Sequence, residues 1–189
     1  NAPAVAQYVF STIGLWLQKH GLSSAEGLTL GVVGVGHVGE IVSRWGEALG
    51  MRVLQNDPPR ERAEESCGFV SLSTIAAEAD IITFHTPLTK SGVDATYHLC
   101  GEAFLSDLKG CRLLINSARG GLIDNKALLG YLKLNNATDV AIDCWEGEPN
   151  INRELLSRAF VATPHIAGYS AEGKMRATAM ILECLGKFY

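Results

Sequence analysis

The chain has 189 residues, of which 47% are hydrophobic and 19% are charged, and its formal net charge is −4. This length and composition predict one globular domain, with room for at most a small appendage. Basic residues neither cluster nor alternate with aromatic residues, so the sequence gives no support for nucleic-acid binding. Apolar runs stay well short of the ~20 residues that span a bilayer, so we also expect no membrane partner.

Five cysteines are scattered along the chain, without a CxxC pair and without a Cys/His spacing that would suit a metal. Isolated cysteines in odd number are typical of reduced thiols, so we expect a cytoplasmic protein with no bound metal. The chain starts at Asn1 instead of methionine and ends on Phe188-Tyr189, which suggests a fragment of a longer protein.

The first predicted element is a helix over Ala2–Lys19. Apolar residues recur there at helical spacing, Pro3 suits a first helical turn, and Gly21 follows the end of the pattern. The helix precedes the first strand, so a minimal nucleotide-binding fold does not require it. Its apolar face is compatible with packing inside the chain or against a partner subunit, and it consists of Val5, Tyr8, Val9 and Trp16.

The next stretch, Leu28–Gly39, reads LTLGVVGVGHVG and predicts a strand, a glycine turn and a helix. This is the context of the GxGxxG fingerprint that binds dinucleotides. Gly34 would turn the chain sharply out of the strand, and Gly36 would let the backbone approach a pyrophosphate. Gly39 would let the helix pack close to the strand. The free N–H groups at the start of that helix favour phosphate.

A second predicted strand, Met51–Asp57, ends in a carboxylate about twenty residues past the fingerprint. A carboxylate there can accept hydrogen bonds from both hydroxyls of the adenosine ribose and would repel a 2′-phosphate, which favours NAD over NADP. Arg60 argues against this preference for NAD, because an arginine just past this strand can hold the 2′-phosphate of NADP. Asp57 could also simply open the turn Asp57–Arg60, since aspartate before proline commonly starts a turn.

Beyond this point apolar strands alternate with helices, which predicts an α/β fold, namely a doubly wound parallel sheet of the Rossmann type with helices on both faces. The predicted strands are Phe69–Val70, Asp80–His85, Cys111–Asn116, Asp139–Asp143 and Phe160–Ala162. The predicted helices are Glu61–Cys67, Ser73–Glu78 with Ser73 as its cap, Glu102–Leu108, Asp124–Asn135 with Asp124 as its cap, Arg153–Leu156 and Ser170–Leu185.

Polar residues follow the ends of several of these strands. In a doubly wound sheet the ligand lies beyond the carboxyl ends of the strands, so we expect these residues to converge on one crevice. They are Asp57, His85-Thr86-Pro87, Asn116–Gly121, Asp143 and Thr163-Pro164-His165.

Three residues of this set and its surroundings would together suit oxidation of a 2-hydroxy acid. Arg119 can clamp a carboxylate, and His165 can take the hydroxyl proton near neutral pH. Glu148 can fix the tautomer of that histidine. Taken singly, each has a plainer explanation as a strand-end arginine, a structural histidine or one of three solvated loop carboxylates. Asp143 could hold a nicotinamide carboxamide. The other four histidines, His20, His37, His85 and His98, are not favoured as catalysts.

Five stretches in order give the chain a family resemblance: GVVGVGHVG, HTPLT, INSARGGLIDNKAL, AIDCWEGEP and TPHIAGYS. The whole chain resembles the cofactor domain of the D-isomer-specific 2-hydroxyacid dehydrogenases. Within that family it is most similar to the members that oxidise 4-phospho-D-erythronate in vitamin B6 biosynthesis. The pointers to this branch are Asp57–Arg60, Thr96–Leu99, Trp145–Pro149 and Gly168-Tyr169-Ser170.

The resemblance implies a role for each matching residue. Arg119 would bind the substrate carboxylate, His165 would be the acid/base and Glu148 its partner. Tyr169 would reach the substrate, as would Arg119 and His165. The residues implied to contact NAD are Gly34, Gly36, His37, Val38, Gly39, Asp57, Thr86, Ser117, Ala118, Arg119, Asp143 and Gly168.

The resemblance also implies an arrangement of domains. Residues 1–20 would be an interdomain helix, and residues 21–189 the NAD-binding domain of a longer enzyme whose substrate domain lies outside this chain. We therefore expect the fragment to bind NAD but to turn over little substrate. Members of the family usually form homodimers through the cofactor domain, so a homodimer is expected.

Two alternatives stay open. One is another D-2-hydroxyacid dehydrogenase, such as a phosphoglycerate dehydrogenase or a hydroxypyruvate or glyoxylate reductase. The other belongs to a different class, the NAD-sensing corepressor-like binding modules that share this fold. Those modules can keep the arginine, glutamate and histidine, so the presence of the three residues does not exclude them.

Overall fold

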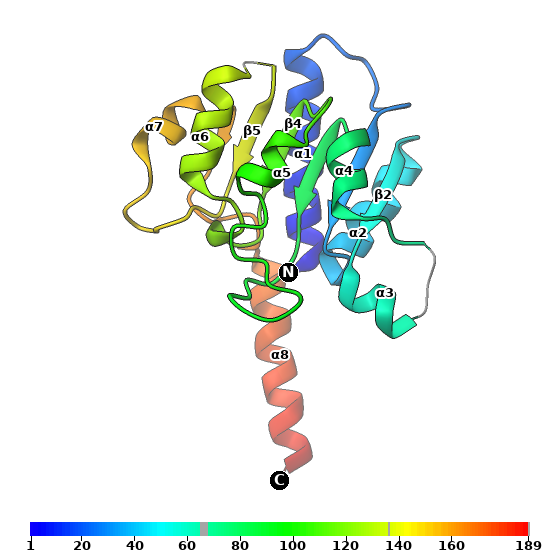
Figure 1. The fold of residues 1–189 in the computed structure, drawn as a ribbon. Coiled ribbons are helices and arrows are strands. Elements are labelled where there is room, and N and C mark those ends of the chain that lie inside the picture. Colours follow the sequence, from blue (N-terminus) through cyan, green and yellow to red (C-terminus); the bar gives the residue numbers. More distant parts are fainter. Residues whose placement is uncertain (65–67, 136, 189) are drawn as a thin grey trace.

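A six-stranded, all-parallel sheet forms the centre of the protein, in the order β2-β1-β3-β4-β5-β6 (Figure 1). The computed structural model describes residues 1–64, 68–135 and 137–188. The order reverses between β1 and β3, as in a doubly wound sheet, so the predicted Rossmann-type fold is confirmed. The strands are β1 (Thr29–Val33), β2 (Arg52–Asn56), β3 (Ile81–Phe84), β4 (Leu113–Asn116), β5 (Asp139–Ile142) and β6 (Val161–Ala162).

Helices cover both faces of the sheet, and each face has its own apolar core. The first core joins β-strand residues to α4, α5, α6 and α7, and the second joins the other strand residues to α1 and α2. β1, β3 and β4 are buried along their whole length because helices lie above and below them. The helices are α1 (Ala2–Lys19), α2 (His37–Ala48), α3 (Pro58–Glu64), α4 (Leu72–Glu78), α5 (Glu102–Ser106), η1 (Gly120–Leu122), α6 (Asn125–Leu134), α7 (Arg153–Arg158) and α8 (Ala171–Phe188).

Three local predictions need correction. The helix after β2 begins at Pro58 and not at Glu61, because proline is tolerated in a first helical turn. The cap of α4 is Ser71, whose hydroxyl accepts the N–H of Thr74, and not Ser73. The predicted strand Phe69–Val70 is only an isolated bridge to Gln55. The end of the predicted helix Glu61–Cys67 lies outside the described residues.

Helix α1 has the predicted bounds and packs on the domain itself. Val5, Val9 and Trp16 are buried, and Trp16 belongs to the second core. Packing within the chain therefore accounts for most of the apolar face that the sequence left unassigned. Tyr8 is half-buried, and its hydroxyl lies 2.8 Å from Thr163 Oγ1. The role of residues 1–20 as an interdomain helix stays a prediction.

Helix α8 projects away from the rest of the protein (Figure 1), and none of its residues from Ala171 to Phe188 is buried. It nevertheless carries large apolar side chains that are at least half exposed, namely Met175, Met180, Ile181, Leu182, Leu185 and Phe188. None of the described helices is both long enough and apolar enough to cross a membrane.

Candidate functional site

The glycine turn after β1 has the close contacts that its sequence predicts. Gly34 adopts a φ of +90°, a conformation that favours glycine, and its N–H donates to the carbonyl of Asn56 at 2.8 Å. A Cβ on Gly39 would lie 2.1 Å from the carbonyl oxygen of Gly34, so no other residue lets α2 approach the turn this closely. A Cβ on Gly36 would meet nothing within 4 Å, which leaves the backbone open to a ligand.

Asp57 fastens this turn to the end of β2. The N–H of Val35 donates to Asp57 Oδ2 at 2.8 Å, and the N–H of Arg60 donates to Asp57 Oδ1 at 3.1 Å. The residue therefore does open α3, as the plainer interpretation held. It also lines a cavity of about 690 Å³ that reaches Gly34 and Gly36. Contact with the adenosine ribose stays a prediction that this position supports.

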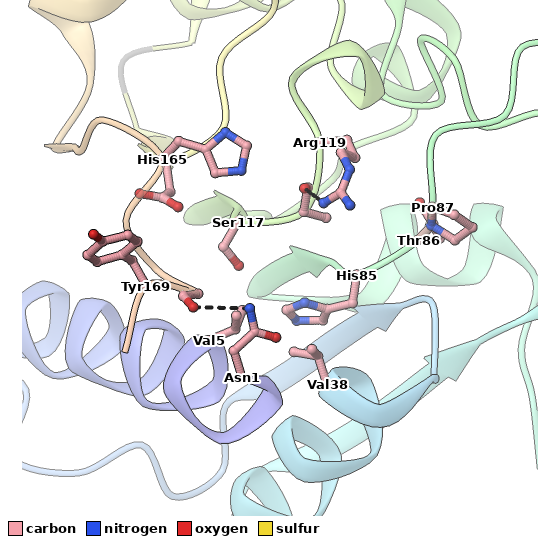
Figure 2. A pocket seen from close by; sticks show the side chains of 13 residues that line it. Asn1, Val5, Val38, His85, Thr86, Pro87, Ser117, Arg119, His165 and Tyr169 are labelled. Atoms are coloured by element: carbon pink, nitrogen blue, oxygen red, sulfur yellow. Dashed lines mark hydrogen bonds between the residues drawn. The ribbon is translucent and has the colours of Figure 1, made fainter. Parts of the chain in front are cut away.

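Most of the predicted site residues meet at one cavity of about 370 Å³ (Figure 2). Figure 2 shows Arg119, Ser117 and His165 around its upper part, with His85 and Val38 opposite. The cavity lies beyond the carboxyl ends of β1, β3, β4 and β5, where a doubly wound sheet binds its ligand. The predicted residues on its wall are Val38, Thr86, Ser117, Ala118, Arg119, Asp143, His165, Gly168 and Tyr169.

The other predicted residues lie beside this cavity. Gly34, Gly36 and Asp57 line the 690 Å³ cavity, which shares Thr86 with the first. His37 lines a third cavity that shares Val38 with the first. Glu148 lines a fourth, together with His165. Gly39 serves packing, because its close contacts are with the backbone of the turn and with Val32.

Two hydroxyls in the cavity are ready for a polar ligand. The Oγ1 of Thr86 and the Oγ of Ser117 are buried, and no other described residue offers either of them a hydrogen bond. An unpaired buried polar atom costs free energy, so a bound polar group would relieve that cost. The turn at Gly36 and the free start of α2 add donors for phosphate. These features fit a dinucleotide.

Asp143 organises the loop that carries His165. Its side chain is fully buried, and both carboxylate oxygens accept hydrogen bonds from that loop. Oδ1 accepts the N–H of Ile166 at 2.8 Å and the hydroxyl of Thr163 at 2.6 Å, and Oδ2 accepts the N–H of Ala167 at 2.9 Å. The sequence suggested only a contact with nicotinamide, so this anchoring role is a finding of the structure.

His165 itself has a φ of 57°, in the left-handed region that residues other than glycine seldom adopt. Its N–H donates to the carbonyl of Asp143 at 2.8 Å, which holds this conformation in place. Such backbone outliers cluster at functional sites.

Glu148 and His165 form the predicted pair. His165 Nδ1 lies 3.0 Å from Glu148 Oε2, and the N–H of Trp145 donates to Glu148 Oε1 at 2.6 Å. The glutamate therefore orients the imidazole so that Nε2 is left for a reacting group. Arg119 follows β4, and its Nη1 donates to the carbonyl of Ala118 at 2.6 Å, which leaves further N–H donors available for a carboxylate.

His85 lies at the crevice, where its place after a predicted strand put it, although the sequence analysis did not favour it as a catalyst. It lines all three cavities that flank the glycine turn. Burial lowers its pKa from 6.5 to about 3, so the imidazole is neutral at physiological pH. Its Nε2 lies 3.0 Å from Thr83 Oγ1. Its place after β3, equivalent to that of Asp57 after β2, is the signal that predicted this location.

The structure also gives His98 a role that the sequence analysis missed. Its Nε2 lies 2.5 Å from Glu146 Oε1, and its Nδ1 lies 3.4 Å from Asp124 Oδ2. Glu146 Oε2 also accepts the N–H of Asn125 at 3.2 Å. These contacts fix the loop that carries Glu148 to the start of α6. The three side chains are close enough to form a candidate metal cluster, but the two imidazole nitrogens face different carboxylates.

Comparison with known proteins agrees with the fold. The profile of the family described as D-isomer specific 2-hydroxyacid dehydrogenase, NAD binding domain, matches residues 7–167. Among solved structures, a glyoxylate reductase from Paecilomyes thermophila superposes with a TM-score of 0.77 at 29% identity, covering 96% of this chain and 60% of that one. A D-lactate dehydrogenase from Aquifex aeolicus, complexed with NAD and lactic acid, gives 0.76 at 26% identity, covering 100% and 66%.

Curated relatives are more similar in sequence. An erythronate-4-phosphate dehydrogenase of Bacteroides fragilis (strain YCH46) is 47% identical over 189 residues, which are 100% of this chain and 54% of the relative. An enzyme of the same name from Escherichia coli O157:H7 (strain EC4115 / EHEC) is 45% identical over 188 residues, or 50% of its length. The chain thus spans about half the length of these relatives. The family profile, which matches most of the chain, shows that the chain belongs to the D-isomer-specific 2-hydroxyacid dehydrogenases, of which it is an NAD-binding domain.

Proposed function

We propose that the protein to which this chain belongs oxidises 4-phospho-D-erythronate to the 2-oxo acid with NAD, in pyridoxine phosphate biosynthesis. The observation that carries the chemistry is the Glu148–His165 pair, 3.0 Å apart, beside the cavity that Arg119 also lines. The substrate rests on the relatives, because proteins named erythronate-4-phosphate dehydrogenase are 45–47% identical across the chain.

In this proposal Arg119 binds the substrate carboxylate through two of its remaining N–H donors. His165 Nε2 then takes the proton from the 2-hydroxyl, because Glu148 occupies Nδ1. The imidazolium that results is stabilised by the carboxylate of Glu148. Tyr169 is highly exposed at the mouth of the cavity, where we propose that it contacts the substrate. The reverse reaction uses the same groups in the opposite order.

The same residues define where NAD is held. We propose that the turn from Gly34 to Val38 contacts the pyrophosphate of NAD and that Asp57 contacts its adenosine ribose. Thr86 and Ser117 would contact the rest of the NAD molecule. When bound, NAD supplies the acceptor for the hydride that leaves C2 of the substrate. Asp143 and Gly168 lie on the nicotinamide side in this arrangement, and Asp143 contributes chiefly by holding the loop of His165.

We further propose that residues 1–20 connect this domain to a substrate domain, and that the complete protein is a homodimer. The isolated chain would then bind NAD with little turnover, because the substrate would be only partly enclosed. The free thiols of Cys100, Cys111, Cys144 and Cys184 support a reducing compartment such as the cytoplasm. Light scattering of the complete protein would give its oligomeric state.

The test is a panel of 2-hydroxy acids given to the complete protein with NAD, with NADH formation followed by absorbance. We expect 4-phospho-D-erythronate to have a kcat/KM at least tenfold above those of 3-phosphoglycerate, glycerate and lactate. The variant His165→Gln should lose at least 100-fold in kcat, because general acid–base catalysis contributes about 10²–10⁴-fold.

Other outcomes would replace the proposal. Preference for 3-phosphoglycerate, glycerate or glycolate would assign the protein to another branch of the family. NAD binding without NADH formation from any acid would favour a sensing module.

A further inference from the structure

An arginine, Arg60, lies close in sequence to Asp57, the carboxylate predicted to bind the adenosine ribose. Arg60 lies three residues after Asp57, and its N–H donates to that carboxylate at 3.1 Å. Arginine in this part of a dinucleotide-binding fold can accommodate the 2′-phosphate of NADP. Choice of cofactor therefore depends on where the guanidinium of Arg60 points and on what it already binds.

The guanidinium is bound by two carboxylates and a carbonyl, through four of its five N–H donors. Its Nε donates to Glu64 Oε1 at 2.6 Å, and its Nη2 donates to Glu64 Oε2 at 3.1 Å. Its Nη1 donates to Glu40 Oε1 at 2.9 Å and to the carbonyl oxygen of Val35. The carboxylate of Glu64 thus binds Nε and Nη2 of the guanidinium in the bidentate manner, and Glu40 binds Nη1. All three nitrogens of the guanidinium have acceptors.

The side chain also lies away from the cavity at Asp57. Pro59, Glu61 and Arg62 belong to the wall of that cavity, whereas Arg60 is absent from the described residues that line it. Arg62, which does line it, is paired with Asp94 Oδ2 at 2.5 Å. Each arginine near the predicted ribose position is therefore already bound to a carboxylate.

The local charge is unfavourable for a second phosphate. The carboxylates of Glu40 and Glu64 bind the guanidinium of Arg60, and the carboxylate of Asp57 accepts the backbone N–H of the same residue. The hydrogen bond with Glu64 raises the pKa of Arg60, and the same bond lowers the pKa of Glu64. Both groups therefore stay charged throughout the physiological range, and the site keeps its excess of negative charge.

We propose that Glu40 and Glu64 are specificity-determining residues, which exclude NADP by holding Arg60 in an ion-paired position away from the 2′ carbon of the ribose. Asp57 is then only part of the selection. The inference rests on the NAD site of this domain and is independent of which hydroxy acid the complete protein oxidises.

The test is calorimetric titration of this chain with NAD and NADP, in four variants. Asp57→Ser removes the ribose carboxylate but keeps a residue that can cap α3. Glu40→Gln/Glu64→Gln releases Arg60, the triple variant combines all three changes, and a fourth variant adds Arg60→Gln to the triple. We expect the triple variant to bind NADP at least tenfold more tightly than Asp57→Ser, because a freed guanidinium forms charge-assisted bonds to phosphate. Arg60→Gln should abolish that gain.

A matched control removes the same charge from two exposed carboxylates elsewhere. Glu26→Gln/Glu47→Gln changes one carboxylate before β1 and one in α2, neither of which contacts Arg60 or lines the cavity at Asp57. It should leave the ratio of the two affinities unchanged, as expected of screened surface charges. If Asp57→Ser fails to fold, Glu40→Gln/Glu64→Gln alone should still tighten NADP binding about threefold.

Equal NADP affinity in the triple variant and Asp57→Ser would overturn the inference. So would a gain that survives Arg60→Gln, or an equal gain in the control. Failure of the unchanged chain to bind NAD would overturn it together with the cofactor site. None of these results bears on the substrate panel, which reports on the proposed function separately.

Discussion

His165 depends on two carboxylates with different tasks. Asp143 is fully buried, and its carboxylate accepts the N–H groups of Ile166 and Ala167 just after the histidine. Its backbone carbonyl accepts the N–H of His165, whose φ is 57°. Glu148 is partly exposed and contacts the imidazole itself at 3.0 Å. The first task is positioning and the second is charge stabilisation. A substitution at each carboxylate should therefore alter activity in a different way.

Glu148→Gln in the complete protein tests the second task. Glutamine preserves the size of the side chain but cannot stabilise an imidazolium, so we expect kcat to fall about 10- to 100-fold and KM to change less than about threefold. Steady-state kinetics with 4-phospho-D-erythronate would measure both. Glu102→Gln, at an exposed glutamate in the first turn of α5, is the control and should stay within about threefold in kcat. Equal losses in the two variants would contradict a specific role for Glu148.

At the scale of the elements, the start of α2 is tightly constrained. Gly39 is buried, and its neighbour in the turn is a carbonyl oxygen that leaves no room for a side chain. Three other helical glycines, Gly14, Gly130 and Gly186, are free of such contacts. A Cβ on Gly14, in the middle of α1, would meet nothing within 4 Å. Substitution of Gly39 and of Gly14 by alanine therefore separates the energetic cost of a steric contact from the preference of a helix for alanine over glycine.

Gly39→Ala should destabilise the chain by about 1–3 kcal/mol, because added volume in a packed region forces the backbone to shift. The same change should weaken NAD binding by displacing the phosphate-binding turn. Gly14→Ala should stabilise the chain by about 0.5–1 kcal/mol, since alanine is preferred to glycine inside a helix. Urea unfolding followed by circular dichroism measures both variants. A stabilised Gly39→Ala chain would refute the contact.

The fold was largely predictable from sequence because strand and helix periodicities are strong in a doubly wound domain. The strand ends also predicted the cavity, with Arg119 and His165 on its wall. What could not be predicted depends on neighbours distant in sequence. Asp143 anchors a loop some 20 residues later, and His85 reaches three cavities only after the sheet is assembled. The cap of α4 was missed because Ser71 and Ser73 are both favoured cap residues, and only the folded backbone decides which hydroxyl accepts the N–H of Thr74.

On the scale of the whole molecule, α1 makes polar contacts at both of its ends, one near the site and the other at the start of β5. Asn1 Nδ2 donates to the carbonyl of Gly168 at 3.0 Å near the site. At the other end of the helix, Lys19 Nζ and His20 Nε2 lie 2.6 and 2.9 Å from the carboxylate of Asp139, at the start of β5. Charge on Asp139 should therefore contribute to the stability of the entire domain.

Burial alone would raise the pKa of Asp139, but hydrogen bonds from Lys19 and His20 outweigh it and lower that pKa. A carboxyl whose pKa is lower in the folded state stabilises the protein above its unfolded pKa of about 3.9, and loses this effect as the pH falls through the folded pKa. We expect Asp139→Asn to cost about 0.5–1 kcal/mol at pH 7 and progressively less below about pH 4.

Urea unfolding at pH 7, 5 and 3.5 would measure this dependence. Asp107→Asn, at the exposed end of α5, is the control and should show no such trend. A cost for Asp139→Asn that stays constant over the same pH range would contradict the role of the ion pairs.

The exposure of α8 has a consequence for the exchange of amide hydrogens with solvent. A helix of 18 residues with none buried receives little stabilisation from tertiary packing, and isolated helices of that length are marginal in water. Its amides should therefore exchange by local opening, orders of magnitude faster than those of β1, β3 and β4, which open only when the domain unfolds. A profile of exchange rates along the chain should accordingly show a sharp step near Ala171, and the helix would become slow only where another surface covers it.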